Sequence, residues 1–587
     1  MFSTPITRVR FPSARDRVRS FQTQRARRVK GITLILDPVR PSLACDTLRP
    51  EMQPRFPHLT LLLLGVLLCS ATPFAGADAA VRAKHRPAHK LPLPQAVARI
   101  LADPGVNQAH WGVSVVTLSG RPIYALNDRQ YFNPASNAKL FTTAAAYALL
   151  PSGLTYTTLV SSSAPISNSG EIRGNVTLLG VGDPNISGRT MPFGFKTERA
   201  GPPLAVLEDM ADQIVRHGVH SVTGDIVGDD TWFPFEPYGA GWSWDDLQWG
   251  YGAPVSALSV NDNVVYLNAL PAAQAGDTAV ASWVPATAYY TLENSLITSP
   301  ASDPGKPGIE RSPGGLAVRI FGQTPLGQHG LHASLSIEDP ADYAARSLRE
   351  MLLARGVQVT GKARAQHRFL SDTGDFLSEQ AQPIALHPIS IENVEAAKPG
   401  EILLASHVSP PLGQDLVVTN KVSQNLHAEI TLRTLGKLES SDGSILEGTR
   451  VVRQFLIMAG VEPADFVLFD GCGLSVQDLA TPRAFTTVLT YAAGQSWGDA
   501  FRTSLPVGGV DGSLSERFKL PLLDGKVFAK TGTLGEANAL SGYLVAASGQ
   551  TIVFSILCTD HRPLQGPSLQ AERAAMDKIV AAIADSN

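Results

Sequence analysis

The chain has 587 residues, of which 44% are hydrophobic and 17% are charged, and its formal net charge at pH 7 is -3. This length exceeds one ordinary domain, so we expect two or three domains, each with enough apolar material for a core. The balanced charge, with no basic run in the body of the chain, does not favour nucleic acid or another polyanion as a partner.

The first 79 residues differ from the rest. Residues 1–51 hold many arginines and no core pattern, and we interpret them as a non-native or disordered leader. Residues 52–79 combine a basic start, the apolar run Leu59–Leu68, and small residues at Ala77 and Ala79, which predicts a signal peptide. The apolar run is shorter than the about 20 residues of a membrane span. We therefore expect export to the periplasm or cell envelope, with peripheral association with the membrane or wall left open.

The cysteine content does not favour a disulfide bond. Cys45 and Cys69 lie in the leader and signal, which leaves Cys472 and Cys558. A chain with large cores does not require a disulfide, and two isolated cysteines are more often small buried hydrophobes.

The elements that follow a basic linker begin with an amphipathic helix over residues 91–104. Residues 111–127 contain two β-rich runs around a turn, which is typical of a hairpin. Residues 133–150 predict a buried helix between two prolines, with Ser136 in its first turn.

Residues 151–400 differ from the flanking regions in composition and pattern, because they contain short β-like runs rich in glycine and proline. Two amphipathic helices, at 202–218 and 339–356, interrupt them. We interpret this region as an insertion of two β-rich domains, the smaller nested around residues 264–335.

Helical periodicity returns from Ser409, and two strands and a closing helix from about Ser568 complete the chain. The outline is an α/β (α+β) fold in which residues 80–150 and 401–587 form one domain that the insertion splits.

Three short patterns in this split domain carry candidate chemistry. The first is Ser136 and Lys139, which share one helical face with Cβ atoms about 5–6 Å apart. A lysine becomes a base for a serine if desolvation and nearby cations lower its pKa from about 10.4. A helix cap followed by a solvated lysine gives the same spacing, so this pair alone is a weak signal.

The second pattern is Ser423 and Asn425, and the third is a strand-like segment between β-like runs. The members of that segment are Lys530, Thr531, Gly532 and Thr533. Alternate side chains of an exposed strand would line one face of a cleft, and Gly532 would allow another group to approach the backbone. Each pattern alone is also expected by chance.

Together and in this order, the patterns Ser-x-x-Lys, Ser-x-Asn and Lys-Thr-Gly are typical of penicillin-binding proteins and class A β-lactamases. The long gap between Lys139 and Ser423 resembles the D-alanyl-D-alanine carboxypeptidase/endopeptidase family (peptidase family S13, penicillin-binding protein 4 type). Supporting stretches from residue 100 onward are "PASNAK", "GVGDPNIS", "GDIVGDDTWF", "GWSWDD", "DGCGLS", "LPVGGVDGSL" and "AKTGT". The resemblance implies a penicillin-binding transpeptidase/β-lactamase-like domain, an antiparallel sheet with helices, that carries β-rich insertion domains.

The same resemblance implies roles for the motif residues. Ser136 would attack a D-Ala carbonyl of a peptidoglycan peptide to form an acyl-enzyme, with Lys139 taking its proton. Ser423 would pass a proton to the leaving amine, and Asn425 would hold Lys139 and the substrate amide. Lys530 would place positive charge near the substrate carboxylate and help to keep Lys139 neutral. β-Lactams would acylate the same serine.

Thr531 and Thr533 would bind the substrate carboxylate, and the backbone N–H groups of Ser136 and Thr533 would form an oxyanion hole. No metal and no cofactor is required by this chemistry.

"GWSWDD" resembles the family's contact with a free amino group on the third residue of the peptide, which would assign that role to Asp246 with Tyr251 packed nearby. A surface carboxylate remains the alternative for Asp246. Some relatives carry an arginine after "DGCGLS" for the carboxylate of diaminopimelate, whereas this chain has Val476, so the third-residue preference stays open. His427, two residues after the second motif, is interpreted as structural.

The leading hypothesis is therefore an exported serine DD-carboxypeptidase with DD-endopeptidase activity. A β-lactamase or D-amino-acid esterase on the same fold is disfavoured, because the insertion offers no candidate for a separate deacylating glutamate. A non-catalytic wall-binding scaffold would have no need of these motifs. The oligomeric state stays open.

Overall fold

The computed structural model describes residues 91–194, 201–371, 374–397, 400–561 and 571–587. The leader and the predicted signal peptide lie outside these residues. So does the predicted start of the closing helix near Ser568.

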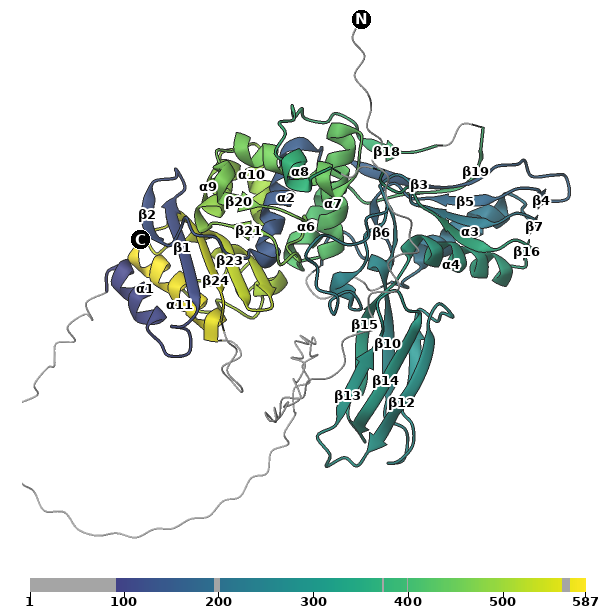
Figure 1. Ribbon diagram of the computed structural model, residues 1–587, viewed down its shortest axis with the longest axis horizontal. Helices are drawn as coiled ribbons and strands as arrows, with labels where there is room; N and C mark the ends of the chain where they lie inside the picture. Colours follow the sequence, from purple (N-terminus) through teal and green to yellow (C-terminus); the bar gives the residue numbers. More distant parts are fainter. Residues whose placement is uncertain (1–90, 195–200, 372–373, 398–399, 562–570) are drawn as a thin grey trace, which may run out of the picture. The chain divides into compact units, whose positions relative to one another are not determined.

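A five-stranded antiparallel sheet joins the two ends of the described chain (Figure 1). Its strands, in spatial order, are β2 (Pro122–Leu126), β1 (His110–Thr117), β24 (Thr551–Thr559), β23 (Ala537–Val545) and β22 (Val527–Leu534). The predicted hairpin forms β1 and β2, and β1 then pairs with β24 along its whole length. Residues 80–150 and 401–587 therefore contribute strands to one sheet.

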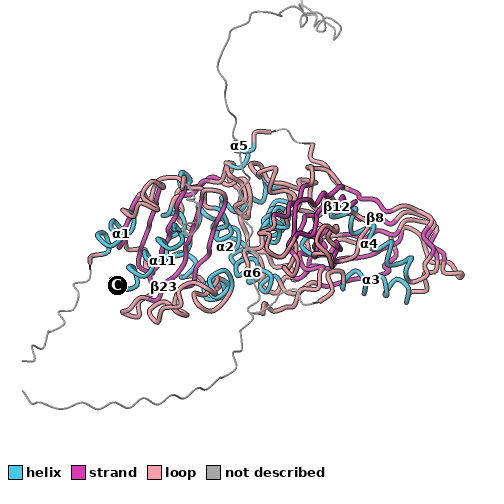
Figure 2. Tube along the Cα trace, turned by 90° about the horizontal axis from the view of Figure 1, so that it is seen from below, coloured by secondary structure: helices cyan, strands magenta, loops and turns pink. Residues whose placement is uncertain are grey.

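Alternation along β24 divides the packing between two cores, because successive side chains of a strand point to opposite faces. Ile552, Phe554 and Ile556 pack with the terminal helices α1 (Leu93–Leu101) and α11 (Ala571–Ser586). Val553 and Leu557 pack instead in a helical core on the other face. Figure 2 shows α1 and α11 on one side of β23 and α2 on the other.

The helical core is the part of the fold that positions the motifs. Its helices are α2 (Lys139–Leu149), α6 (Leu412–Lys421), α7 (Asn425–Ser440), α8 (Ile445–Met458), α9 (Pro482–Ala493) and α10 (Gly498–Ser504). Every residue of α2 except Ala148 is buried, in agreement with the buried helix that the sequence predicts, and the buried residues include the polar Lys139, Thr142 and Thr143. The short strands β20 (Phe466–Val467) and β21 (Leu479–Ala480) pair beside this core.

The insertion is built on a six-stranded sheet that two helices, α3 (Ala205–Arg216) and α4 (Pro340–Ala354), help to cover. Its strands are β17 (Ala363–Gln366), β8 (Ile226–Asp229), β5 (Val176–Leu179), β3 (Thr155–Ser162), β18 (Asn393–Glu395) and β19 (Ile402–Val408). Smaller sheets pair β16 (Gln358–Val359), β7 (Ser221–Val222) and β4 (Glu171–Ile172), and separately β6 (Asp183–Ile186) and β9 (Leu258–Val260).

Two three-stranded sheets lie in the nested region. They are formed by β11 (Val280–Val284), β10 (Val264–Leu270) and β15 (Leu331–Ser336), and by β12 (Thr291–Ser299), β14 (Ala317–Pro325) and β13 (Lys306–Glu310). Buried residues of these strands belong to the same hydrophobic core as α3 and α4, so the nested sheets share a core with the rest of the insertion.

The strand pairing and packing place the far border of the insertion differently from the predicted residue 400. Strand β19 pairs with β3, so the insertion's sheet extends to Val408. Helix α5 (Phe376–Gln380) and Ile389, in contrast, pack against the helical core. The chain therefore packs against the helical core before it completes the insertion's sheet.

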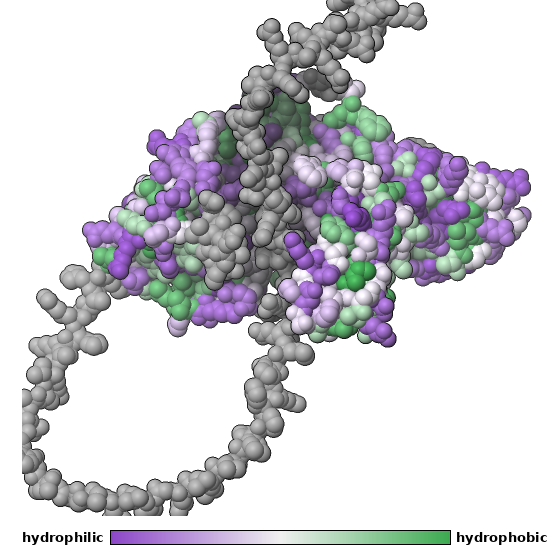
Figure 3. Space-filling view, turned by 60° about the horizontal axis from the view of Figure 1, so that its bottom comes forward, coloured by the Kyte–Doolittle hydropathy of each residue, from purple (hydrophilic) through white to green (hydrophobic). Residues whose placement is uncertain are grey.

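The surface and helices of the described residues give two further observations. Among them, no helix is both long and apolar enough to cross a membrane. On the face shown in Figure 3, hydrophilic residues predominate and hydrophobic residues gather only in small separate patches.

Candidate active site

The first motif lies at the entry to α2. Ser136 belongs to a short 3-10 turn, Ala135–Ala138, and the α-helix itself begins at Lys139. Ser136 is thus in the turn before the helix and not in the first α-helical turn. Ala135 has a left-handed φ of 44°, and its N–H donates to Asn133 Oδ1 at 2.8 Å, which fixes the turn.

The amine of Lys139 connects the first motif to the second. Lys139 is fully buried, and its Nζ lies 2.9 Å from Ser136 Oγ, 2.6 Å from Asn425 Oδ1 and 2.7 Å from the carbonyl oxygen of Cys472. The amide and carbonyl oxygens only accept hydrogen bonds, whereas a hydroxyl both donates and accepts. In a neutral amine, the two N–H bonds therefore serve these two oxygens, and the lone pair is left for the Ser136 hydroxyl.

Burial lowers the pKa of Lys139, which favours this neutral form. Acidic groups nearby, Asp470 and Glu429 among them, act in the opposite direction. The lysine is therefore placed to take a proton from Ser136.

The second motif forms the junction of α6 and α7. Ser423 has a left-handed φ of 61°, a conformation that costs free energy for a non-glycine residue. Asn425 starts α7, and its Nδ2 donates to the backbone carbonyl of Tyr251 at 2.8 Å. The Asn425 amide therefore joins Lys139 on one side to the loop at Tyr251 on the other.

The third motif lies on β22, at the edge of the sheet. Lys530 is fully buried and its Nζ donates to Ser423 Oγ and to the carbonyl of Thr531, both at 2.8 Å. Burial and the nearby charge of Lys139 lower the pKa of Lys530 well below its ordinary value. Three side-chain hydrogen bonds therefore join the five predicted residues in two sets, Lys139 with Ser136 and Asn425, and Lys530 with Ser423. The two sets meet at the α6–α7 junction, where Ser423 and Asn425 are two residues apart.

The glycine of the third motif sets the distance between β22 and the serine turn. A Cβ atom on Gly532 would lie 2.9 Å from the carbonyl oxygen of Pro134 and 3.0 Å from the backbone nitrogen of Ser136. No side chain fits there without moving the serine's own backbone. Thr531 and Thr533 flank this contact, with Thr531 Oγ1 2.8 Å from Ser513 Oγ and Thr533 Oγ1 3.2 Å from Asn538 Oδ1.

Arg573 on α11 is a candidate site residue that sequence reasoning missed. Its Nη2 donates to Thr533 Oγ1 at 3.3 Å, so a guanidinium lies beside a hydroxyl that was predicted to bind a carboxylate. Arg573 is 40 residues after Thr533 and belongs to no motif. The only signal for Arg573 in the sequence is that it is a basic residue on the closing helix, which packs against the sheet that contains β22.

The stretch "DGCGLS" is a loop that holds the Cys472 carbonyl against Lys139. The Asp470 carboxylate accepts the backbone N–H groups of Cys472, Gly473, Leu474 and Ser475 at 2.6 to 3.1 Å. A Cβ atom on Gly473, whose φ is 78°, would lie 1.8 Å from the carbonyl oxygen of Ala135. The sequence resemblance singled out this loop without showing this role.

Asp246 and Tyr251 lie together beside the motifs. Tyr251, which is half exposed, donates from its hydroxyl to Asp246 Oδ1 at 2.7 Å, and burial raises the pKa of Asp246. The same loop meets "DGCGLS", because Val476 N donates to the carbonyl of Gly241 at 3.1 Å. Val476 is exposed there and offers no charge to a ligand.

Among the described residues, one group of side chains lies close enough together to hold a metal ion: Glu429, Asp470 and Cys472. Glu429 already accepts from Arg433 Nη1 at 2.8 Å and from the N–H of Gly471 at 2.6 Å. Asp470 accepts the four N–H groups of its own loop, and burial raises the pKa of the Cys472 thiol well above its ordinary value. This donor set fits hydrogen bonding and not a metal ion. Cys472 and Cys558 are both buried as free thiols.

Comparisons with known proteins identify a matching family and several similar proteins. A family model described as the D-Ala-D-Ala carboxypeptidase 3 (S13) family matches residues 93–389 and 384–583. A D-alanyl-D-alanine carboxypeptidase of Actinomadura sp. (strain R39) is 30% identical over 539 residues, which are 90% of this chain and 89% of that relative.

The fold is similar to the crystal structure of penicillin binding protein 4 (dacB) from Haemophilus influenzae. The TM-score is 0.65 at 21% sequence identity, and the match covers 83% of this chain and 98% of that one. A second structure of that protein, complexed with a β-lactam, gives a TM-score of 0.63 at 20% identity over 84% of this chain and 98% of that one. The predicted fold class, a penicillin-binding or β-lactamase-like domain with extra β-rich domains, is confirmed.

Proposed function

Because the chain belongs to the S13 family of D-Ala-D-Ala carboxypeptidases, it is a serine-type carboxypeptidase, and we propose that its acyl-enzyme forms on Ser136. The observation that carries this proposal is the contact of a buried lysine amine with the serine hydroxyl at 2.9 Å. The substrates are peptidoglycan peptides that end in D-Ala-D-Ala.

Acylation begins when Ser136 Oγ attacks the carbonyl of the penultimate D-Ala while its proton passes to Lys139 Nζ. The peptide C–N bond breaks, and the leaving D-Ala amine receives a proton through the Ser423 hydroxyl. Ser423 is suited to this relay because Lys530 donates to its oxygen at 2.8 Å, which leaves its own O–H free to point toward the leaving group. Water then hydrolyses the ester and returns the proton to Ser136.

The terminal carboxylate of the substrate binds beside Thr531, Thr533 and Lys530. A bound carboxylate favours the charged form of Lys530, and that charge in turn favours the neutral form of Lys139. Arg573, which donates to Thr533 Oγ1, adds a second cation at this end of the site. Substrate binding therefore helps to keep Lys139, the proposed base, in its neutral form.

Endopeptidase activity, export and reaction with β-lactams belong to the same proposal. Tyr251 and Val476, beside the site, are exposed and therefore accessible to a cross-linked peptide, which supports endopeptidase activity. Export rests on the predicted signal at residues 52–79. The solved H. influenzae relative is described in complex with a β-lactam, and a Ser-Lys pair of the present geometry supports the same acylation here.

The decisive experiment is incubation of the purified protein with fluorescent penicillin, followed by denaturing electrophoresis. We expect one covalent label per chain in the wild type and none in Ser136→Ala. Ser119→Ala, an exposed serine in the β1–β2 turn, is the matched control and keeps the label. An unlabelled wild type, or a labelled Ser136→Ala, contradicts the proposal, and rapid nitrocefin turnover identifies a β-lactamase instead.

A further inference from the structure

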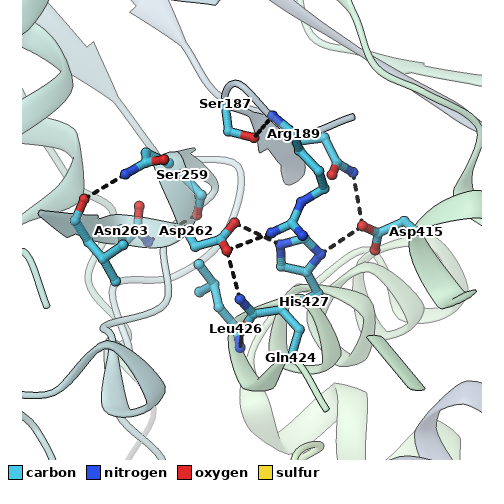
Figure 4. A network of polar contacts seen from close by, with 12 residues as sticks. Ser187, Arg189, Ser259, Asp262, Asn263, Asp415, Gln424, Leu426 and His427 are labelled. Atoms are coloured by element: carbon cyan, nitrogen blue, oxygen red, sulfur yellow. Dashed lines mark hydrogen bonds and ion pairs between the residues drawn. The ribbon is translucent and has the colours of Figure 1, made fainter. Parts of the chain in front are cut away.

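The mechanism leaves a buried charged network next to the second motif unused (Figure 4). At its centre, His427 is fully buried between two carboxylates, with Nδ1 2.7 Å from Asp415 Oδ1 and Nε2 3.1 Å from Asp262 Oδ1. Asp262 also accepts from Arg189 Nη2 at 2.6 Å and from Gln424 Nε2 at 2.8 Å. Asp415 accepts from Asn185 Nδ2 at 2.9 Å.

This network requires a charged histidine. A carboxylate oxygen only accepts, so each ring nitrogen that faces one must carry a proton. Burial lowers the pKa of His427, but the carboxylates of Asp415 and Asp262 more than offset this effect and raise it to about 9. The other charged groups around it are Arg189 and Asp183, both from the insertion.

The network joins the insertion to the element that carries the second motif. Asp262 and Arg189 belong to the insertion, whereas His427 and Gln424 belong to α7 and its cap, and Asp415 belongs to α6. Figure 4 shows Asp262 reaching from the insertion to the start of the helix that bears His427. Gln424 stands between the two motif residues Ser423 and Asn425.

Gln424 transmits this contact to the motif. Its Oε1 accepts the N–H of Leu426 at 3.1 Å and so caps α7, while its Nε2 is held by Asp262. The residue before it, Ser423, is in the strained left-handed conformation, which persists only where its surroundings fix it. The side chain of Gln424 is thus the link between a fixed carboxylate and the strained serine.

Asp262 is itself fixed by its neighbours. Asn261, Asp262 and Asn263 have consecutive left-handed φ angles of 51°, 55° and 54°. Asn263 holds this turn through bonds to the N–H of Val260 at 3.0 Å and the carbonyl of Pro254 at 2.8 Å. A rigid turn of the insertion therefore presents the carboxylate.

We propose that Asp262 and His427 are positioning residues: through Gln424 they hold Ser423 and Asn425 where the proton relay and the lysine base need them. The insertion is then a part of the catalytic machinery and not only an accessory domain. This inference rests on the proposed function, because it concerns the same acylation.

The protein contains a matched control for this proposal. His367 also bridges two carboxylates, with Nδ1 2.8 Å from Asp230 Oδ1 and Nε2 3.2 Å from Asp339 Oδ2, and its pKa is likewise raised, to about 10. His367 lies within the insertion and has no contact with α7 among the described hydrogen bonds and ion pairs. The two histidines share their chemistry and differ in their connection to the motif.

The experiment compares Asp262→Asn, His427→Gln and Gln424→Ala with His367→Gln. The turnover number for a D-Ala-D-Ala peptide is divided by the fraction of enzyme that saturating fluorescent penicillin labels, so unfolded protein does not count. We expect the turnover number per labelled site to fall about 10- to 100-fold in the first three variants, because small misplacements of catalytic groups have effects of this size. His367→Gln keeps the wild-type value per labelled site.

Coupling between the variants separates positioning from mere destabilisation. Gln424→Ala adds little to Asp262→Asn if both act through one contact. If Asp262→Asn does not fold, Gln424→Ala still tests the proposal, because its side chain is uncharged and only partly buried. Wild-type turnover per labelled site in Gln424→Ala, or an equal loss in His367→Gln, overturns it. A wild type that penicillin does not label contradicts the proposed function instead.

Discussion

The hydrogen-bond acceptors around Lys139 determine which way the lone pair of its neutral amine points. Two of its three contacts are oxygens that only accept, so the third, Ser136, is where the neutral amine directs its lone pair. The sequence predicts the spacing of this pair, because it follows from helical geometry. It does not predict the Cys472 carbonyl, which arrives from a loop more than 300 residues away.

The pH dependence of acylation tests the state of Lys139. The proposed mechanism needs the neutral amine of Lys139, and burial lowers the pKa of this amine from the ordinary 10.5. As the pH falls through the lowered pKa, the amine becomes protonated and the rate falls. We therefore expect the acylation rate constant, measured with a fluorescent penicillin, to reach its plateau below pH 10.5. A rate constant that keeps rising through pH 10.5 would contradict a lowered pKa of Lys139.

Gly532 tests the close approach of β22 to the serine turn. In Gly532→Ala, the new methyl group would press on the carbonyl of Pro134 and the nitrogen of Ser136. We expect the acylation rate constant to fall about 100-fold, because the turn that carries Ser136, the proposed nucleophile, must move. Gly153→Ala is the control, since a Cβ atom there meets nothing within 4 Å. Equal rates in the two variants show that the approach is not required.

At the scale of elements, the left-handed break at Ser423 divides a helical stretch into α6 and α7. Periodicity predicts helices on this stretch, but it does not predict where they separate, because the break depends on Asp262 and Lys530 from other parts of the chain. His427 is a similar case. Its interpretation as structural followed from its isolation in sequence, whereas in the fold it lies between Asp262 and Asp415.

The loop that carries Asp246 and Tyr251 makes a prediction about the third residue of the peptide. In Asp246→Asn, the carboxylate that would bind a free amino group is lost, and we expect kcat/KM for an amino-bearing peptide to fall about tenfold. The same peptide with its amine acetylated is expected to show no change. Asp245→Asn, the exposed neighbour, serves as the control. If both peptides lose activity equally, Asp246 acts on the fold and not on the amine.

At the scale of the whole molecule, the His427 network ties stability to pH. The pKa of His427 is about 9 in the folded protein against 6.5 when it is exposed. Its contribution of about 3 kcal/mol is therefore fully present below pH 6.5 and is lost as the pH rises through about 9. Burial raises the pKa of Asp183 to about 7, so that group titrates mainly below this window.

We expect the melting temperature of the wild type to fall between pH 7 and pH 9.5, and the fall to be smaller in His427→Gln. His367, with a pKa of about 10, contributes equally to both proteins and cancels in the comparison. Calorimetry at several pH values provides the measurement. Parallel curves for the two proteins would mean that His427 is not protonated in the folded state.

The pairing of β1 with β24 has a consequence for how the protein is made. Residues 111 and 558 are partners in one sheet. Strand β1 is therefore synthesised long before β24, the strand with which it pairs, and cannot form this pairing until β24 has been made. The strands of the insertion, from Thr155 to Val408, are contiguous and can assemble while synthesis continues. Closing a sheet across such a separation is slow. We therefore expect nascent chains that end before Thr551 to present a formed insertion beside an incomplete sheet whose open edge is prone to aggregation.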